Sequence, residues 1–385
     1  TVSSRVLGGL LIASQGLPGI AIAADTPLRF AHVVREGDPA FIGAEAFSEK
    51  VTELSDGRIE VKLFPAGQLG NNRKLFTQIQ SGAVDMTFTP FNMLADIVPE
   101  FATITGGYMF EDQAHQRAVL DSPEMGGAWA ETLLEKGGLR ILSSFFYGTR
   151  NVTTKETPVR SPEDLAGLKL RAVPNAMSLA TVTGLGAAPT PVAWPETFQA
   201  LRQGIVDGQE NPIPVLHAAK FYEVQKYLIK TGHQMSALPF LIREATWKSL
   251  SEADQAVVME AALHGQAVAE EAMVTFTETL ESDLVDRGME IIELSDDEID
   301  VFRTSVRAQV AEDFDGSVLP AGLIDLIHAM SEYAGLPAWT GARAARRAPA
   351  GRSCGRRRAR GPAVWRGPET GSVRLLSASM PRNRG

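Results

Sequence analysis

Apolar and polar positions alternate along the chain with the periods of helices and strands. In "AFIGAEAFSEKVTEL" (40–54) the apolar side chains share one helical face, and in "RIEVKLFP" (58–65) every second residue is apolar. The "SDG" between these segments predicts a turn. A further strand is expected in "LRFAHVV" (28–34). The three segments therefore predict a β–α–β unit.

The alternation continues with clear signals for helix starts. Ser161 and Asp164 form a capping box before a short helix, and "LKLRAV" (168–173) follows as a strand. The segment 250–288 carries another capping box and no proline, which predicts a helix of more than 30 residues that is long enough to lie across two domains. We expect an α/β protein whose helices cover mostly parallel sheets.

Length and composition are consistent with a large exported protein. The chain has 385 residues, enough for two domains, and its 44% hydrophobic content is ordinary for a soluble globular protein. Arg5, an apolar stretch and small residues at 21–23 predict a secretory signal peptide over 1–24. Gln15 and Pro18 interrupt the stretch, which argues against a membrane span. The only cysteine is Cys354, so we expect no disulfides.

Residues 341–385 differ in composition from the rest of the chain. They contain twelve Arg, no Lys and one acid, Glu369, without a helical or strand period. We expect a disordered tail, and the frameshifted end of a GC-rich gene would give the same composition; a basic arm for nucleic acid or acidic membrane is the alternative. Because the tail adds +11 to a total of −9, residues 1–340 carry −20, which argues against nucleic acid as a partner.

Signatures of catalysis, metal binding and nucleotide binding are missing from the sequence. None of the six histidines stands in HExxH or another close ligand spacing, and there is no GxSxG or Walker loop. We therefore predict no catalytic residue, cofactor or metal. Arg171, at the exit of "LKLRAV", and Asn211, in "VDGQENPIP", both stand at or just past the ends of expected strands. Ligands of α/β proteins bind beyond strand ends, and the planar fork of Arg matches a carboxylate.

Several long motifs resemble segments of one family. "GTRNVTTKETPVRSPEDLAGLKLRAVPNA", "GAAPTPVAWPETFQALRQGIVDGQENPI", "AAKFYEVQKYLI" and "FPAGQLGNNRKLFTQIQSGAVDMTF" are similar to the solute-binding proteins of TRAP transporters (DctP type), over about residues 28–335. The resemblance implies a two-domain periplasmic-binding-protein fold that closes like a flytrap, with crossing strands and a long domain-spanning helix. It implies the domains 25–148 plus 237–276 and 149–236 plus 277–340.

The resemblance also implies which residues bind the ligand. An Arg matching Arg171 grips the ligand's carboxylate in this family, and an Asn matching Asn211 supports it. The sialic-acid branch is the most similar over residues 148–230. Arg150, in "YGTRN", matches a second cation of that branch, and Trp194, in "VAWPE", matches its aromatic wall.

The expected ligand is an organic acid. Where the sialic-acid branch has acidic ligand contacts, this chain has Asn72 and Pro90. A uronate, an aldonate or a C4-dicarboxylate therefore fits as well as sialate or better. His32, at the end of the first expected strand, has two interpretations, a donor to a ligand hydroxyl or second carboxylate, or a structural loop histidine.

The function implied is that of a monomeric periplasmic receptor. It would capture an organic acid and deliver it to the small and large integral-membrane subunits of a TRAP transporter. Two alternatives stay open at this point. A ligand-presenting component of a sensory system would bind in the same way, whereas a periplasmic enzyme acting on organic acids would need a general base or a metal, for which the sequence offers no spacing.

Overall fold

The nine strands among residues 26–330 pair into one mixed sheet. The computed structural model describes these residues; the predicted signal peptide and the predicted Arg-rich tail lie outside them. The strand order is β2-β1-β3-β8-β4-β7-β5-β6, and β9 pairs with β8. The strands are β1 (Thr26–Ala31), β2 (Ile59–Phe64), β3 (Met86–Phe88), β4 (Leu139–Thr154), β5 (Lys169–Ala172), β6 (Ala188–Pro191), β7 (Gly208–Asn211), β8 (Tyr227–Arg243) and β9 (Glu290–Ile292).

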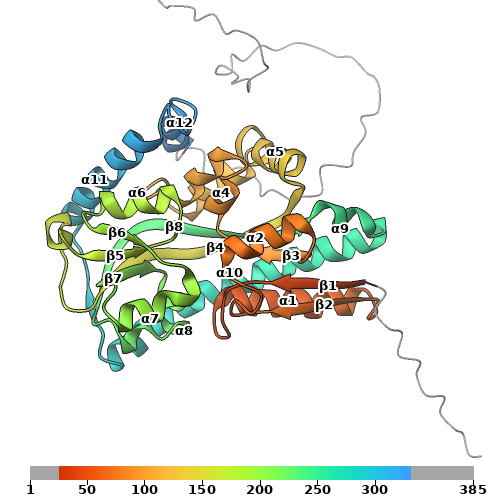
Figure 1. Ribbon diagram of the computed structural model, residues 1–385, viewed down its shortest axis with the longest axis horizontal. Coiled ribbons are helices and arrows are strands. Elements are labelled where there is room, and N and C mark those ends of the chain that lie inside the picture. Colours follow the sequence, from red (N-terminus) through yellow and green to blue (C-terminus); the bar gives the residue numbers. More distant parts are fainter. Residues whose placement is uncertain (1–25, 331–385) are drawn as a thin grey trace, which may run out of the picture. The chain divides into compact units, whose positions relative to one another are not determined.

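Helices surround this sheet. In Figure 1, α1 and α2 lie beside β1–β3 at one end, and α6, α7 and α8 lie beside β5–β7 at the other. The helices are α1 (Pro39–Leu54), α2 (Asn72–Ser81), α3 (Phe91–Leu94), α4 (Gln113–Asp121), α5 (Ala128–Gly137), α6 (Ala176–Gly184), α7 (Thr197–Arg202), α8 (Ile213–Ala218), α9 (Glu244–Ser249), α10 (Glu252–Asp286), α11 (Asp296–Phe314) and α12 (Leu323–Ala329), with 3₁₀ turns at Pro99–Thr105, Pro162–Leu165, Trp194–Glu196 and Phe221–Glu223 and a π turn at Pro123–Gly127.

The two longest strands, β4 and β8, run antiparallel through the middle of the sheet and join its two ends. The outer pairs β1–β2, β1–β3, β5–β6 and β5–β7 are parallel, as expected from the sequence. The middle pairs β3–β8, β4–β8 and β4–β7 are antiparallel, so the expectation of mostly parallel sheets holds only for the outer strands. The β4–β8 ladder is interrupted between Phe146 and Thr149 and again between Arg150 and Val152.

The predicted long helix is confirmed as α10, which has 35 residues. It packs against α1 at one end of the sheet, against β4 in the middle and against α8 at the other end. Contact with α1 is close because glycines face each other: a Cβ added at Gly43 would lie 2.7 Å from the carbonyl oxygen of Gly265 and 2.7 Å from the Cβ of Ala269. Farther along the same helix, Met273 and Leu284 are buried in two different hydrophobic clusters.

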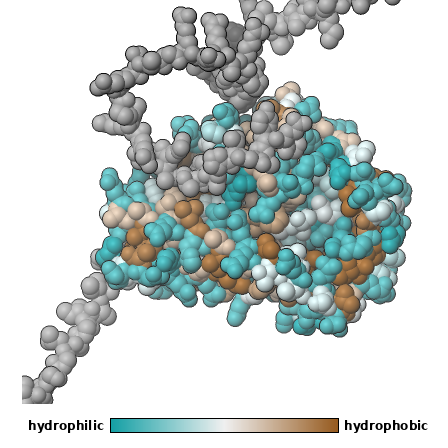
Figure 2. Space-filling view, turned by 180° about the vertical axis from the view of Figure 1, so that it is seen from behind, coloured by the Kyte–Doolittle hydropathy of each residue, from teal (hydrophilic) through white to brown (hydrophobic). Residues whose placement is uncertain are grey.

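The helix starts confirm part of the sequence signals, because the capping box of Ser161 and Asp164 is formed whereas α10 has only a side-chain cap from Ser251. Ser295 and Glu298 form a complete capping box at the start of α11, and the Ser251 side chain accepts from the Asp254 amide at the start of α10. Each interaction pairs a backbone amide that the helix leaves free. On the face shown in Figure 2, hydrophilic residues predominate and hydrophobic residues form separate patches.

The described residues 26–330 belong to one compact unit, and the predicted division into two domains stays a prediction. The expected boundaries, 148/149 and 236/237, fall inside β4 and β8. The first boundary coincides with the interruption of the ladder between Phe146 and Thr149.

Candidate functional site

A cleft with about 540 Å³ of empty space, part of it open to solvent, lies where the two ends of the sheet meet the crossing strands. Its lining comes from segments distant in sequence, which only the fold brings together. Fourteen residues line it: Val33, Val34, Asn72, Phe88, Thr89, Pro90, Tyr147, Arg150, Arg171, Val173, Trp194, Asn211, Val215 and Leu238. Six of the seven residues predicted to bind ligand are among them; the seventh, His32, is not.

His32 lies beside the cleft, within the hydrophobic core. Its ring is fully buried and packs edge-on against Phe30 and Phe41 and at a tilt against Phe88. Neither ring nitrogen makes a hydrogen bond of acceptable geometry. Burial lowers the pKa of His32 to about 4, opposed in part by the Val34 backbone, so the ring is neutral at pH 7. This environment is that of a core histidine.

Arg171 is a buried cation without a carboxylate partner. It stands on β5, is 2% exposed, and its Nε donates to the carbonyl of Val192 at 2.9 Å. Among residues 26–330, no carboxylate lies within ion-pair distance of its guanidinium, and neither terminal nitrogen makes a hydrogen bond. Burial lowers the pKa of Arg171 to about 10, which leaves the side chain charged at neutral pH. The site therefore holds a desolvated positive charge that an anion would neutralise.

Arg150, the second predicted cation, is already neutralised by the protein. Its guanidinium forms a two-pronged ion pair with Glu210, in which Nη2 lies 2.7 Å from Oε1 and Nε pairs with Oε2, and Nη2 also donates to the Glu210 carbonyl at 2.6 Å. Burial raises the pKa of Glu210, but the charge of Arg150 and hydrogen bonds from His233 and Arg150 outweigh it and lower the pKa to about 2. This pair contributes no net charge to the cleft.

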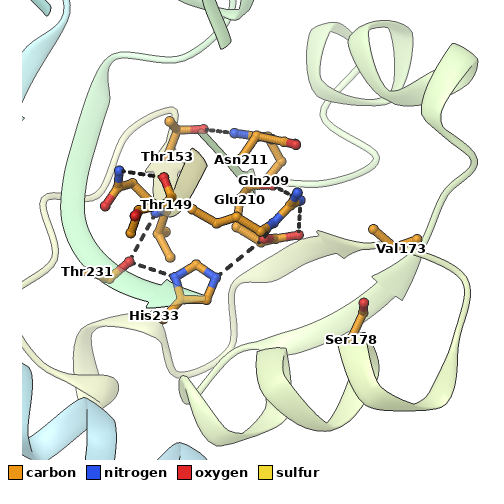
Figure 3. A network of polar contacts seen from close by, with 12 residues as sticks. Thr149, Thr153, Val173, Ser178, Gln209, Glu210, Asn211, Thr231 and His233 are labelled. Carbon is orange, nitrogen blue, oxygen red and sulfur yellow. Dashed lines mark hydrogen bonds and ion pairs between the residues drawn. The ribbon is translucent and has the colours of Figure 1, made fainter. Parts of the chain in front are cut away.

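Behind this ion pair, a chain of buried polar groups leads away from the cleft. The Nε2 of His233 lies 3.4 Å from Oε2 of Glu210, and its Nδ1 lies 2.8 Å from the hydroxyl of Thr231. Figure 3 shows His233 between these two partners. The hydroxyl of Thr231 in turn accepts from the backbone amide of Val152. Every link is buried, so the chain fixes the carboxylate that orients Arg150.

Asn211 is held in place by its neighbours on β7. Its amide nitrogen donates to Oε1 of Gln209 at 2.6 Å, and Gln209 donates to the hydroxyl of Thr153 at 2.9 Å. Figure 3 shows these side chains at the end of β7. A second hydrogen on the same nitrogen remains for a ligand. The three polar residues 209–211 therefore have different roles: Gln209 and Glu210 orient their neighbours, and Asn211 lines the cleft.

Trp194 joins the two ends of the sheet across the cleft. Its ring packs against Phe221 at 5.6 Å and lies 5.7 Å from the guanidinium carbon of Arg171. It also packs against a cluster at the other end of the sheet that includes Val33 and Leu75. The indole therefore covers the Arg171 guanidinium and closes one wall of the cleft.

The wall opposite Arg171 comes from α2, β3 and the turn after β3. Asn72 is the first residue of α2 and Pro90 precedes α3, and both line the cleft as predicted. Thr89, between β3 and Pro90, is 1% exposed and was not expected from the sequence. The side-chain oxygens Oδ1 of Asn72 and Oγ1 of Thr89 are buried and have no hydrogen-bond partner. Two polar atoms are thus left for a ligand, the Asn72 oxygen as an acceptor and the Thr89 hydroxyl as a donor or an acceptor.

Tyr147 and Asp38 are further site residues that the sequence analysis missed. Tyr147 lines the cleft, and its hydroxyl donates to Oδ2 of Asp38 at 2.6 Å. Asp38 is 2% exposed and also caps α1 by accepting from the Ala40 amide. Burial raises the pKa of Asp38 to about 6, although both hydrogen bonds lower it. The Asp-Pro pair before α1 is a visible capping signal, but its contact with Tyr147 spans 109 positions.

In the range 26–330, no three His, Cys, Asp or Glu side chains are grouped so that they could hold a metal ion. Among the helices of that same range, none is long and apolar enough to cross a membrane.

Comparison with known proteins decides the family. Residues 30–316 match the model of the bacterial extracellular solute-binding proteins, family 7 (DctP). The chain belongs to this family. It is 38% identical over 247 residues to a solute-binding protein of Roseobacter denitrificans, covering 64% of this chain and 75% of that one, and 35% identical over 242 residues to the sialic acid-binding periplasmic protein SiaP of Vibrio cholerae, covering 63% and 74%.

A solved DctP-family structure shows the same fold. It is a TRAP periplasmic solute-binding protein of Roseobacter denitrificans with bound L-galactonate, 30% identical, with a TM-score of 0.73 over 80% of this chain and 99% of that chain. The mixed α/β fold and the long helix that contacts both ends of the sheet are therefore those of this family. DctP-family members are periplasmic transport proteins without enzymatic activity, which confirms the class of protein inferred from the motifs.

Proposed function

We propose that this DctP-family protein captures an organic acid in the cleft through a clamp on its carboxylate. Arg171 supplies the charge and Asn211 an amide hydrogen. The observation that carries the proposal is that Arg171 is buried, charged and without a carboxylate partner in residues 26–330, while the neighbouring Arg150 is paired. A carboxylate provides the opposite charge and two acceptor oxygens in the geometry that a guanidinium fits.

The bound acid would then be passed to the small and large membrane subunits of a TRAP transporter. A sugar acid such as a uronate or an aldonate, or a C4-dicarboxylate, is the proposed cargo. The bound L-galactonate in the relative from Roseobacter denitrificans and the name of SiaP support an acidic ligand. Because the cleft has lining residues from both ends of the sheet, a ligand that contacts both would favour a closed arrangement, in the manner of a flytrap.

The test is calorimetric titration of the protein and its Arg171→Met variant with L-galactonate and a panel of other organic acids. Losing the partner of a buried carboxylate costs roughly 2–5 kcal/mol, so affinity should fall at least thirtyfold. Arg160→Met is the matched control, because this exposed Arg pairs with Glu298 outside the cleft, and it should leave affinity unchanged.

Two results would overturn the proposal. One is an Arg171→Met variant that keeps the affinity of the parent protein. The other is a thermal-shift screen in which only neutral or cationic compounds raise the melting temperature. A melting curve of each variant without ligand establishes that the fold is intact.

A further inference from the structure

The charges in the cleft allow the ligand's own charge to be counted. Only Arg150 and Arg171 among the fourteen lining residues carry full charges at neutral pH. Glu210 neutralises Arg150 through two contacts. One positive charge, on Arg171, is left without a partner. A ligand with one carboxylate would bring the cleft to neutrality, and a second carboxylate would leave an excess negative charge in a desolvated site.

The wall opposite Arg171 offers no charged lining residue that would pair with a second carboxylate. Its apolar lining residues are Val33, Val34, Phe88, Pro90 and Leu238. At the start of α2, Oδ1 of Asn71 accepts from the amide of Lys74, and the lining residue Asn72 carries no charge. Behind Tyr147 stands the Asp38 carboxyl group, which accepts the phenol's only hydrogen and so adds no donor toward the cleft. A carboxylate at this wall would meet neither a cation nor an arginine fork.

The same wall does offer two unpaired polar atoms, an amide oxygen and a hydroxyl. Oγ1 of Thr89 and Oδ1 of Asn72 are buried without a partner, on residues that line the cleft. Buried acceptors are ordinarily paired. A ligand that leaves such an acceptor unpaired binds more weakly, because the free energy of that hydrogen bond is lost. A carboxylate has only acceptor oxygens, so it cannot pair with Asn72 Oδ1. A ligand hydroxyl carries the hydrogen that this oxygen needs.

We propose that the ligand is a hydroxylated monocarboxylate, with its carboxylate on Arg171 and a terminal hydroxyl that donates to Oδ1 of Asn72 and accepts from the hydroxyl of Thr89, and that dicarboxylates of the same length are rejected. The inference rests on the proposed function and narrows it. The carbon chain lies between these ends, against Phe88, Pro90 and Leu238. Selectivity then follows from the charge count at Arg171 and from the unpaired Oδ1 of Asn72, which a hydroxyl can satisfy and a carboxylate cannot.

Two matched pairs of acids test this proposal, because each pair differs only in whether the far end is CH₂OH or a carboxylate. They are 4-hydroxybutanoate against butanedioate, and L-galactonate against the corresponding hexaric acid. Calorimetry should show the hydroxy monocarboxylate binding at least tenfold more tightly in every pair that binds. Asn72→Lys places a cation at the far wall and should shift the preference toward the dicarboxylate.

Threonine variants test the contact with the hydroxyl. Thr89→Val keeps the shape of the side chain, removes the hydroxyl, and should weaken binding of the hydroxy acid about tenfold. The control is Thr181→Val, since Thr181 also has a buried hydroxyl without a partner but does not line the cleft. This control should bind as the parent does.

The outcomes separate the two proposals. If a dicarboxylate binds as tightly as its hydroxy partner, or if Thr89→Val and Asn72→Lys both behave as the parent protein, the monocarboxylate inference is wrong while the clamp on Arg171 stands. If none of the four acids binds at millimolar concentration, the monocarboxylate inference is wrong for these acids. The titration of Arg171→Met with the wider panel of organic acids then decides whether the carboxylate clamp is correct.

Discussion

Replacing Glu210 by Gln should destabilise the protein measurably, because the carboxylate is stabilised by its surroundings. Its pKa of about 2, against 4.5 for the unpaired group, gives the ionised form about 3 kcal/mol of folding free energy at neutral pH. Glu210→Gln removes that contribution and leaves Arg150 buried beside a neutral amide. For a domain of this size, the melting temperature should fall by roughly 5 °C.

The pH dependence sets the sign of this effect. A depressed carboxyl pKa contributes stability that is fully present above pH 4.5 and is lost as the pH falls toward 2. The difference in unfolding free energy between parent and variant should therefore be constant from pH 5 to 8 and shrink in stronger acid. Urea denaturation at a series of pH values measures it.

Glu290→Gln is the matched control for this experiment. Glu290 pairs with Lys226 at 2.9 Å, but the Glu290 side chain is 59% exposed and that of Lys226 is 50% exposed. An exposed pair contributes at most about 1 kcal/mol. If Glu210→Gln costs no more than Glu290→Gln, the reasoning that the cleft depends on a buried, oriented Arg150 is refuted.

Two further predictions concern His32 and Trp194. Burial lowers the pKa of His32 from 6.5 to about 4, so the parent protein loses stability as the pH falls through this window. Between pH 7.5 and 4.5, the unfolding free energy of His32→Leu should rise by about 2 to 3 kcal/mol relative to that of the parent, as measured by urea denaturation. A difference that does not depend on pH would contradict a buried, neutral ring. Trp194 lies against Arg171, so the intrinsic fluorescence of the protein should change when an acid binds. Trp194→Phe should abolish that change, whereas Trp247→Phe, at a residue that does not line the cleft, should keep it. If the change survives in Trp194→Phe, Trp194 is not the residue that reports binding.

The local elements were predictable because each carries its own pattern. The first β–α–β unit appears as β1, α1 and β2, with β1 and β2 parallel, and the uninterrupted segment after Ser251 appears as one helix. The antiparallel centre was not predictable in this way. β4 and β8 are buried along much of both faces, so they lack the alternation that would indicate their faces, and their partner is set by pairing across the whole sheet.

The site residues also differ in how far the sequence alone indicates them. Arg171 and Asn211 could be found because polar groups near the end of a strand are conspicuous in sequence, and the family motif adds their expected roles. The neutralisation of Arg150 could be anticipated only loosely, since Glu210 lies 60 positions away on β7. Thr89 carries no distinguishing local pattern, and the Asp-Pro pair at Asp38 indicates only the start of a helix. Their significance depends on what the fold places opposite them, a cleft in one case and the Tyr147 hydroxyl in the other.

The course of α10 restricts how this protein can change during evolution. Its 35 residues place Gly265 against α1 and, farther along, Met273 and Leu284 in separate hydrophobic clusters. The rotation of the helix about its axis must therefore suit all three contacts at once. One inserted or deleted residue would turn every later side chain by about 100° and shift it by about 1.5 Å. Changes of length should therefore be tolerated in the turn around Gly288 and selected against between Gly265 and Leu284, where homologous chains can diverge only by substitution.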